Sequence, residues 1–369
     1  MSLEVGWERV KLRAPELAPG VWLNHAPLTL KGLRGHVVLV DFWDYTCVNC
    51  LRTLPYLVEW WRRYQDKGLT IIGVHAPEFT FARSADFVRQ AMQDYGVTYP
   101  VVLDNEHRTW YAFANRFWPA KYLIDQDGYL RYKRFGEGHY DETEAAIQGL
   151  LRERQPDVAL PDVMPALRAE DAPGAVCYRP TPELYAGAER GDLANAEGYR
   201  PGKVVTYADP GEYEERRFYA VGAWGSDDEA LRAAGPDATL ILPYAAAQVN
   251  AVLAPNLSPA PSPTRGGGEY SPPSLVGKGA GGLGPPRLYL TQDGAPLAAG
   301  QAGEDVHLAG GEAWVEVDRP KMYNVVVNPT VERHILRLRA ATPGVAVYAF
   351  TFVTCVRGTE DEGRTTKDQ

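Results

Sequence analysis

Val40-Asp-Phe-Trp-Asp-Tyr-Thr-Cys-Val-Asn-Cys50 is the stretch that decides the fold of the first part of this 369-residue chain. Just before it, residues 37–40 form a continuous apolar run, which predicts a central strand buried on both faces. After it, apolar residues recur at helical spacing until Gly68, a residue typical of a helix C-terminus. These apolar residues are Leu51, Leu54, Leu57, Val58 and Trp61. The cysteine pair is therefore expected at a junction between a strand and a helix.

The following hundred or so residues continue the alternation of strands and helices. The expected elements are a strand over 69–74, a helix over 84–95, a strand over 100–103, strands over 121–125 and 129–135, and a helix over 141–152. The order strand, helix, strand, helix predicts a parallel sheet. Between the last two strands, Asp127 and Gly128 favour a hairpin, because this dipeptide tolerates positive φ. The sequence thus predicts an α/β domain over residues 1–154.

The hydrophobic periodicity changes in the second half of the chain. Apolar side chains alternate over 218–224, 313–317 and 345–353, with turn residues between the runs. Many short strands without a clear helix predict an all-β sandwich of the jelly-roll kind. The predicted divisions are a linker over 155–180, a β-sandwich domain over 181–358 with a disordered insertion rich in Pro, Gly and Ser over 256–286, and a flexible tail over 359–369.

Composition and charge argue against some classes of function. The formal net charge is −9 and basic residues form only brief clusters, which argues against a nucleic-acid-binding surface. No segment reaches the roughly 20 apolar residues that span a bilayer, so no membrane insertion is expected. The N-terminal residues contain no hydrophobic signal core, and the chain as written is expected in the cytoplasm.

The spacing of Cys47 and Cys50 indicates chemistry rather than a structural bridge. A ring closed over two intervening residues is too small to hold a fold together, so the pair is expected to react or to bind a metal. Cys47 would lie at the first turn of a helix, where unpaired amides and the helix dipole favour a thiolate. Cys50, one turn further, would then attack the mixed disulfide and resolve it.

Asp41 interrupts the apolar strand ahead of the cysteines. A carboxylate there would be desolvated beneath the start of the helix, so its proton affinity should rise and it could relay a proton for Cys50. The alternative is a carboxylate that simply turns outward on an edge strand. The burial expected on both faces of the strand favours the relay.

At residues 40–50 the sequence resembles the thioredoxin superfamily, in particular its TlpA and ResA type. It is similar to the soluble C-terminal part of DipZ-like proteins. The similarity includes Trp118 and Pro119 ahead of residues 121–125, and then residues 136–138, so that it covers about the first 150 residues. A relation to DipZ-like proteins would imply an extracytoplasmic location, in contrast to the location expected from the N-terminus.

The resemblance implies roles for three further residues. Pro119 would be a cis proline that faces the cysteines and helps to bind the backbone of a client, the protein whose disulfide is exchanged; a trans loop proline is the alternative. Trp118 and Trp43 would belong to the same client-binding surface. Thioredoxin itself has Gly and Pro between its cysteines, whereas this chain has Val48 and Asn49, so the direction of exchange stays open.

Three alternatives to disulfide exchange remain. Zinc would need four ligands, and the sequence offers neither a second cysteine pair nor suitably spaced histidines. A peroxidase of the peroxiredoxin kind would need a Pro and a Thr at fixed spacing upstream of its reactive cysteine, and no suitable Pro precedes Cys47. The third alternative is a carbohydrate-binding or protein-binding module attached to a redox-inactive thioredoxin-like domain.

The second domain resembles the carbohydrate-binding-module-like domain that follows the thioredoxin-like domain in DipZ-like proteins. Aromatic side chains exposed on its strands could stack on sugar rings, although aromatics at alternating positions are more often part of a core. The candidates are Trp224, Tyr244, Trp314 and Tyr323. Cys177 and Cys355 lie near the two ends of this domain, and two buried free thiols are favoured over a disulfide.

The sequence as a whole predicts a thiol-disulfide oxidoreductase in which Cys47 attacks, Cys50 resolves and Asp41 relays a proton. No metal and no organic cofactor is required for this chemistry. The expected partners are proteins with thiols or disulfides and an upstream redox partner. A carbohydrate or protein ligand of the β domain is expected in addition.

Overall fold

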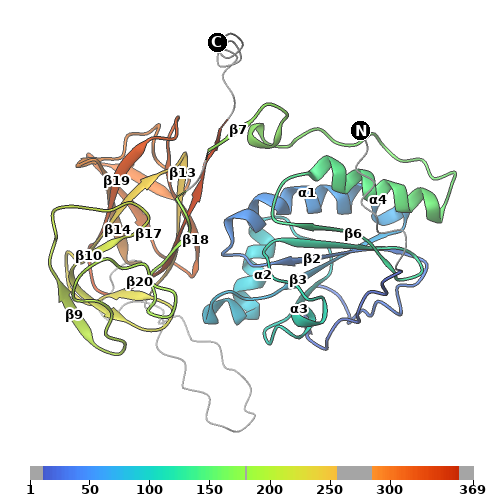
Figure 1. Cartoon of the computed structure of the whole chain (residues 1–369), viewed down its shortest axis with the longest axis horizontal. Coiled ribbons are helices and arrows are strands. Elements are labelled where there is room, and N and C mark those ends of the chain that lie inside the picture. The colour runs from blue at the N-terminus through green and yellow to red at the C-terminus, as the bar shows by residue number, and fades with distance from the viewer. Residues whose placement is uncertain (1–10, 179–180, 256–284, 357–369) are drawn as a thin grey trace, which may run out of the picture. The chain divides into compact units, whose positions relative to one another are not determined.

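The computed structural model describes residues 11–178, 181–255 and 285–356 (Figure 1). The chain divides into two compact units, Met1–Ala172 and Pro173–Gln369. Across the described ranges, every helix is too short or too polar to cross a membrane. All but the last two residues of the predicted insertion over 256–286, and the whole predicted tail over 359–369, lie outside the described residues.

Over residues 11–172 the first unit contains a six-stranded mixed sheet in the order β1-β4-β3-β2-β5-β6. Its strands are β1 (Val21–Trp22), β2 (Val37–Trp43), β3 (Leu69–His75), β4 (Val101–Leu103), β5 (Ala120–Ile124) and β6 (Leu130–Phe135). The predicted parallel arrangement holds for β2, β3 and β4, whereas β1, β5 and β6 pair antiparallel. The predicted hairpin between β5 and β6 is confirmed, and Gly128 in its turn has φ +83°.

Helices cover both faces of this sheet (Figure 1). They are α1 (Val48–Tyr64), α2 (Ala85–Asp94), α3 (Arg108–Ala112) and α4 (Tyr140–Arg154), with short 3₁₀ turns η1 (Gln65–Lys67), η2 (Thr80–Arg83) and η3 (Ala169–Asp171). The helices α1 and α4 lie on one face and α3 on the other (Figure 1). The sequence did not predict α3, because five residues are too few for a helical periodicity to show.

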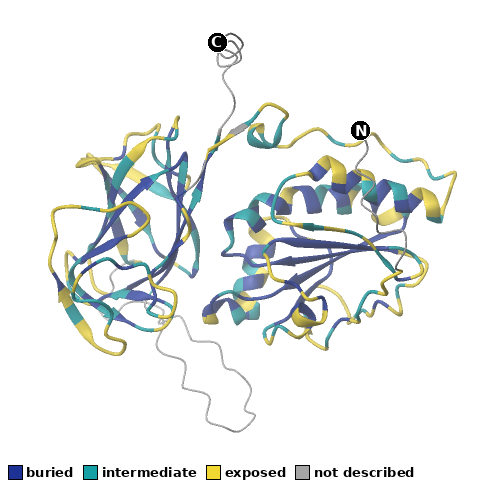
Figure 2. Ribbon diagram, viewed as in Figure 1, coloured by how far each residue is buried: buried dark blue, intermediate teal, exposed yellow. Residues whose placement is uncertain are grey.

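Alternation along β2 separates the two faces of the sheet. Every residue of β2 and β3 is buried (Figure 2), which confirms the expectation of a central strand covered on both sides. Val38, Val40 and Phe42 pack in one hydrophobic cluster with Trp110 of α3. Because neighbouring strand residues point to opposite faces, Asp41 lies on the face that α1 covers.

The segment that follows α4 is packed onto the first unit. Glu144 of α4, which is fully buried, accepts hydrogen bonds from the Arg63 and Tyr64 side chains of α1 and, at 2.9 Å, from the backbone N–H of Met164. The Leu167 N–H donates to the Tyr56 hydroxyl at 2.8 Å. The chain up to Ala172 thus follows the surface of α1 and α4 and belongs to the first unit.

The described residues of the second unit form strands and the loops between them. The strands are β7 (Val176–Cys177), β8 (Leu184–Tyr185), β9 (Val204–Tyr207), β10 (Tyr219–Ser226), β11 (Leu231–Ala233), β12 (Thr239–Ala245), β13 (Gln248–Pro255), β14 (Arg287–Gln292), β15 (Ala295–Pro296), β16 (Val306–Ala309), β17 (Glu312–Glu316), β18 (Lys321–Val327), β19 (Arg333–Ala340), β20 (Val345–Val353) and β21 (Cys355–Val356). Thirteen of them form one sheet, with the main path β16-β17-β14-β19-β12-β10-β11-β20-β13-β18.

This sheet folds over on itself at β10 and encloses one hydrophobic core, which agrees with the predicted β-sandwich. The first half of β10, Tyr219–Val221, pairs with β12, and its second half pairs with β9 and β11. The change of partner falls at Gly222, whose φ of +81° is readily adopted only by a residue without a Cβ. The strand therefore belongs to both layers, and the sheet is nearly barrel-shaped.

Three of the four aromatic residues considered for sugar stacking are core residues instead. Trp224, Tyr244 and Tyr323 have exposed fractions of 0%, 1% and 1%, so no sugar ring can reach them in this structure. The burial follows from strand alternation, which places them on the inner face of the sheet. Trp314 is half-buried, with its ring 5.7 Å from that of His307.

The expectation of two buried free thiols in the second unit is wrong. Cys177 and Cys355 form a disulfide, in which Cys177 is exposed and Cys355 half-buried. They lie directly opposite each other in the antiparallel pair of β7 and β21, with a Cα–Cα distance of 4.0 Å. The register of these two strands, which are 178 residues apart, brings the thiols together.

Candidate active site

The Cys47–Cys50 pair lies at the start of α1, as the sequence predicts. Cys47 is the N-cap residue, with extended backbone angles, and the N–H of Cys50 donates to Cys47 Sγ at 3.2 Å. The pair is present as two thiols with the sulfur atoms 2.6 Å apart. Formation of a disulfide between them therefore requires only a small movement.

The two cysteines differ in their access to solvent. Cys47 is half-buried, whereas Cys50 has an exposed fraction of 1%. Burial, and secondarily the hydrogen bond to Cys47, raises the pKa of the Cys50 thiol well above its usual range. Cys50 thus stays protonated until a base takes its proton, while Cys47 is the sulfur that another protein can reach.

Asp41 supplies a carboxyl group beneath this pair. It is fully buried in β2, and neither of its carboxyl oxygens has a hydrogen-bond partner among the residues that the structure describes. Burial raises its pKa to about 7, and the charge of Lys121 opposes this rise. A carboxyl group with this pKa can both accept and donate a proton near neutral pH.

Lys121 is a second buried ionisable group on the same face of the sheet. It is the register partner of Asp41 on β5, and its exposed fraction is 0%. Its Nζ donates to the carbonyl oxygen of Gly136 at 3.3 Å. Burial lowers the pKa of Lys121, and the neighbouring charges of Asp41 and Cys50 oppose that effect. Asp41 and Lys121 therefore form one coupled pair below the start of α1.

Asp44 fixes the loop between β2 and α1. It is fully buried and accepts hydrogen bonds from the N–H and the hydroxyl of Thr46, at 2.7 and 2.9 Å, and from the N–H of Glu78. Its carbonyl oxygen accepts from the N–H of Cys47 at 3.2 Å. This residue thus ties the Cys47 backbone to the segment that follows β3.

The His75 ring beside this loop is neutral at ordinary pH. Burial lowers the pKa of His75 to about 3, so the ring carries no charge near neutral pH. Its Nε2 lies 3.8 Å from the Asp44 carboxylate and forms no ion pair with it at that pH. The ring lies parallel to that of Tyr45 at 5.6 Å and edge-on to that of Trp43 at 5.1 Å. His75 therefore acts as packing for the loop.

The structure places Trp43, Trp118 and Pro119 at the end of the sheet where β2 leads into the cysteine loop. The Trp118–Pro119 peptide bond is cis, as the resemblance implies. Pro119 precedes Ala120, the register partner of Phe42, so it lies across from the end of β2. Trp118 is half-buried and its Nε1 donates to the Ala76 carbonyl at 3.0 Å. Trp43 has an exposed fraction of 0%, so its side chain is covered from a client in this structure.

Charged residues flank the start of α1. Arg52, two positions after Cys50, donates to Glu137 at 2.7 Å, and Arg168 lies 3.6 Å from the same carboxylate. Arg168 also forms a bidentate ion pair with the Asp171 carboxylate, in which Nε and Nη2 each donate a hydrogen bond of 2.7 Å. These contacts join the cysteine helix, the loop after β6 and the segment after α4.

Sequence reasoning missed Lys121, Asp44 and Glu137 as members of this site. A lysine within the apolar run of β5 was the available signal for Lys121, because a charge in a central strand needs a partner. Asp44 and Glu137 act through contacts with segments far away in the sequence, for which the sequence offers no comparable signal.

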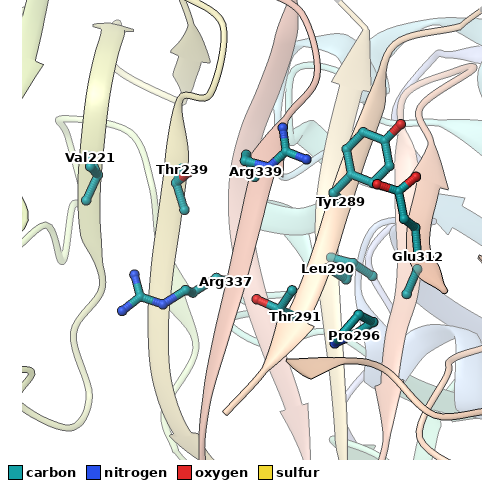
Figure 3. A pocket seen from close by; sticks show the side chains of 10 residues that line it. Val221, Thr239, Tyr289, Leu290, Thr291, Pro296, Glu312, Arg337 and Arg339 are labelled. Atoms are coloured by element: carbon teal, nitrogen blue, oxygen red, sulfur yellow. The ribbon is translucent and has the colours of Figure 1, made fainter. Parts of the chain in front are cut away.

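A separate pocket of about 260 Å³ lies on the second unit (Figure 3). Its lining comes from β10, β12, β14, β15, β17 and β19 and includes Thr239, Tyr289, Glu312, Arg337 and Arg339 (Figure 3). The Arg339 guanidinium lies 4.8 Å from the Tyr289 ring and forms an ion pair with Asp237 at 2.9 Å. The pocket thus offers hydroxyl, carboxylate and guanidinium groups beside one aromatic ring.

Two family profiles match the chain. Residues 14–133 match the AhpC/TSA family, and residues 181–266 and 275–352 match the thioredoxin-like C-terminal domain family. The chain is 38% identical over 248 residues to protein DipZ of Mycobacterium tuberculosis, a match that covers 63% of this chain and 33% of DipZ. The chain thus spans about a third of the length of that relative.

Two shorter relatives are matched over most of their own length. Thiol-disulfide oxidoreductase YkuV of Bacillus subtilis is 29% identical over 150 residues, which cover 40% of this chain and all of YkuV. Thiol-disulfide oxidoreductase ResA of Bacillus thuringiensis is 30% identical over 134 residues, which cover 36% of this chain and 72% of ResA. Taken with the α/β fold of the first unit and the cysteine pair at its helix start, this match shows that the chain belongs to the thioredoxin-like family of ResA.

Proposed function

We propose that this chain exchanges disulfides with protein clients through its Cys47-Val48-Asn49-Cys50 motif. One observation carries the proposal: two thiols 2.6 Å apart at a helix start, one accessible and one buried above a carboxyl group whose pKa is about 7. Such an arrangement suits an attacking thiol, a resolving thiol and a base.

In the first step the Cys47 thiolate attacks one sulfur of the client disulfide. The N-terminal amides and the dipole of α1 favour the negative charge on Cys47. A bond forms between Cys47 and that client sulfur, the client S–S bond breaks, and the second client sulfur leaves as a thiolate that takes up a proton.

In the second step Cys50 completes the exchange. Its proton passes to the Asp41 carboxylate, and its thiolate attacks Cys47 Sγ, which already lies within contact distance. The Cys47–Cys50 bond forms, the mixed disulfide breaks, and the client leaves with two thiols. The two electrons come from the Cys47–Cys50 dithiol, which an upstream redox partner must reduce again. The reverse sequence oxidises a client.

Exposed aromatic side chains next to the cis proline support a client-binding surface. Phe117 and Tyr111 have exposed fractions of 54% and 74%, and Phe117 immediately precedes Trp118 and Pro119. Exposed aromatic side chains are typical of protein-binding surfaces. We therefore propose that Phe117 and the half-buried Trp118 contact the client, while Pro119, which is buried, shapes the surface beside them.

The Cys177–Cys355 disulfide supports the extracytoplasmic location over the cytoplasmic one. Disulfides persist in oxidising compartments and are rare where glutathione and thioredoxin keep thiols reduced. The bridge of the second unit is partly exposed and would be open to reduction in the cytoplasm.

Two measurements on the purified full chain test the proposal. A redox titration of the Cys47–Cys50 pair against glutathione gives its potential. A value of about −270 mV indicates a reductant, and one of about −120 mV indicates an oxidant. Reduction of insulin, followed by its turbidity, tests exchange with a protein. Loss of insulin reduction in Cys47→Ser is expected. Equal rates for the wild type and Cys47→Ser would contradict the proposal, and rapid peroxide consumption that needs Cys47 would favour the peroxidase.

The pocket of the second unit favours a polar ligand as a second function. Its aromatic ring, hydroxyls and charged groups suit the apolar face and the hydroxyls of a sugar, and Tyr289, Arg337 and Glu312 are the residues in question. Calorimetric titration with a panel of neutral and acidic oligosaccharides, on the wild type and on Tyr289→Ala, tests this role. Binding that the variant retains undiminished would contradict the assignment of the pocket.

A further inference from the structure

We infer that the Cys177–Cys355 bridge is itself a substrate of the Cys47–Cys50 pair of the same molecule, an inference that rests on the proposed function. Its first support is accessibility. Cys177 is exposed and Cys355 is half-buried, and neither belongs to the hydrophobic core of the second unit. A thiolate can therefore approach this disulfide without any unfolding of the sandwich.

The second support is the local nature of the bridged structure. The strands β7 and β21 form a separate two-stranded sheet with two register pairs, apart from the thirteen-stranded sheet. The strands are held by their antiparallel pairing and the disulfide, and next to them two hydrogen bonds join Tyr178 and Thr354, at 3.3 and 2.8 Å. Breaking the S–S bond thus loosens a small element while the core of the unit keeps its contacts.

The third support is the short length of chain between the bridge and the first unit. Asp171 is still anchored there, because the Tyr56 hydroxyl of α1 donates to its carboxylate at 2.7 Å. Six residues lead from Asp171 to Cys177, and an extended chain of that length spans at most about 20 Å. Tyr56 lies six residues beyond Cys50 on the same helix, a rise of about 9 Å. A tether this short gives the two cysteine pairs a high effective concentration for each other.

The exchange balances without a further reactant. The Cys47 thiolate bonds to Cys177 Sγ, the Cys177–Cys355 bond breaks, and Cys355 leaves as a thiolate that is protonated. Cys50 then gives its proton to Asp41 and bonds to Cys47, and Cys177 leaves as a thiol. One disulfide is reduced and one dithiol is oxidised, so that two electrons move from the first unit to the second.

A trapping experiment on the full chain tests the first of these steps. In Cys50→Ser the mixed disulfide cannot go on to a Cys47–Cys50 disulfide, so alkylation of the released thiol followed by proteolysis without reductant should yield a peptide that joins Cys47 to Cys177 or Cys355 in the monomer. The matched control is Cys47→Ser, which keeps Cys50 and should yield no such peptide. Absence of the joined peptide in Cys50→Ser, or its presence only in covalent dimers, would overturn the inference.

A kinetic measurement covers the complete exchange. With limiting dithiothreitol, alkylation and mass spectrometry follow the opening of the Cys177–Cys355 bridge in the wild type and in Cys47→Ser. We expect opening at least tenfold faster in the wild type, and equal rates would overturn the inference. Insulin reduction by the same wild-type sample separates the two claims: if insulin is reduced while the bridge opens at equal rates, the inference alone fails, and if insulin is not reduced either, the proposed function fails as well.

Discussion

Cys47 and Cys50 are three positions apart at the start of a helix, whereas Cys177 and Cys355 are 178 positions apart and meet across two short strands. The helix holds the first pair of sulfurs together whether or not they are bonded, so its disulfide forms and breaks with little change in chain entropy. The second bridge closes nearly the whole second unit into a loop. Its loss increases the conformational entropy of the unfolded chain and so destabilises the folded unit. The first pair is thus suited to repeated disulfide exchange, whereas opening or closing the second bridge changes the stability of the second unit.

The sharpest test of this difference is removal of one sulfur from each pair. Cys47→Ser should lower the rate of insulin reduction by at least about 10³-fold, because the nucleophile is lost. Cys177→Ser should leave that rate within about twofold of the wild type, since the second pair takes no part in exchange with other proteins. The turbidity of insulin under excess dithiothreitol measures the rates of insulin reduction by both variants. A large loss of rate in Cys177→Ser would show that the two pairs act as one relay.

The second pair should dominate stability instead. Replacement of both Cys177 and Cys355 by serine removes a bridge across 178 residues, for which the chain-entropy relation gives a loss of about 5 kcal/mol and typical measured losses run from about 2 to 5 kcal/mol. Amide hydrogen exchange in the full chain should show faster exchange in β20 of the second unit and unchanged exchange in β2 of the first. Faster exchange in both units alike would contradict the assignment of the bridge to the second unit alone.

The sequence predicted the first pair far better than the second, and the reason is distance along the chain. Cys47, Cys50 and Asp41 lie within eleven residues of one strand-to-helix junction, so local periodicity places all three. The Cys177–Cys355 bridge depends on the register of two strands at opposite ends of the second unit. Lys121 falls between these cases, because its partnership with Asp41 depends on how β5 pairs with β2.

Burial of the aromatic residues of the second unit shows the same limit. Alternation over 218–224 predicted a strand, and β10 covers all of this run except Phe218, but alternation alone does not say which face is covered. Trp224 lies inside because β10 takes part in both layers of the folded sheet. An alternating pattern thus predicts a strand with two different faces. Only the pairing of the strands decides which of these faces is exposed to solvent.

Asp41→Asn should separate proton transfer from the rest of the exchange. With a carboxyl pKa of about 7, the wild-type rate of insulin reduction should rise with pH through 7, as Asp41 loses its proton and becomes able to accept one from Cys50. The variant should be about 10²-fold slower at pH 8 and should lack the inflection near pH 7. A matched control is Asp94→Asn at the end of α2. An unchanged inflection in Asp41→Asn would assign it to another group.

The same substitution should alter the pH dependence of stability. The pKa of Asp41 is raised from 3.8 to about 7 by burial, so its contribution to stability is full below pH 3.8 and is lost as the pH rises through 7. The loss amounts to roughly 4 kcal/mol at most. His75 contributes the opposite slope at acidic pH, because burial lowers its pKa to about 3. The difference between the urea-unfolding curves of wild type and Asp41→Asn therefore isolates Asp41, and a difference that does not vary between pH 4 and 7 would contradict its raised pKa.

Lys121→Met should have the smallest effect, a displacement of the pH profile. The charge of Lys121 opposes the rise that burial causes in the pKa of Asp41, so its removal should raise that pKa further. The inflection in insulin reduction should therefore move to higher pH, with a nearly unchanged rate at pH 9. Lys133→Met, at an exposed position of β6, is the matched control and should leave the inflection in place. A move to lower pH in Lys121→Met would mean that Lys121, and not Asp41, holds the proton that Cys50 releases.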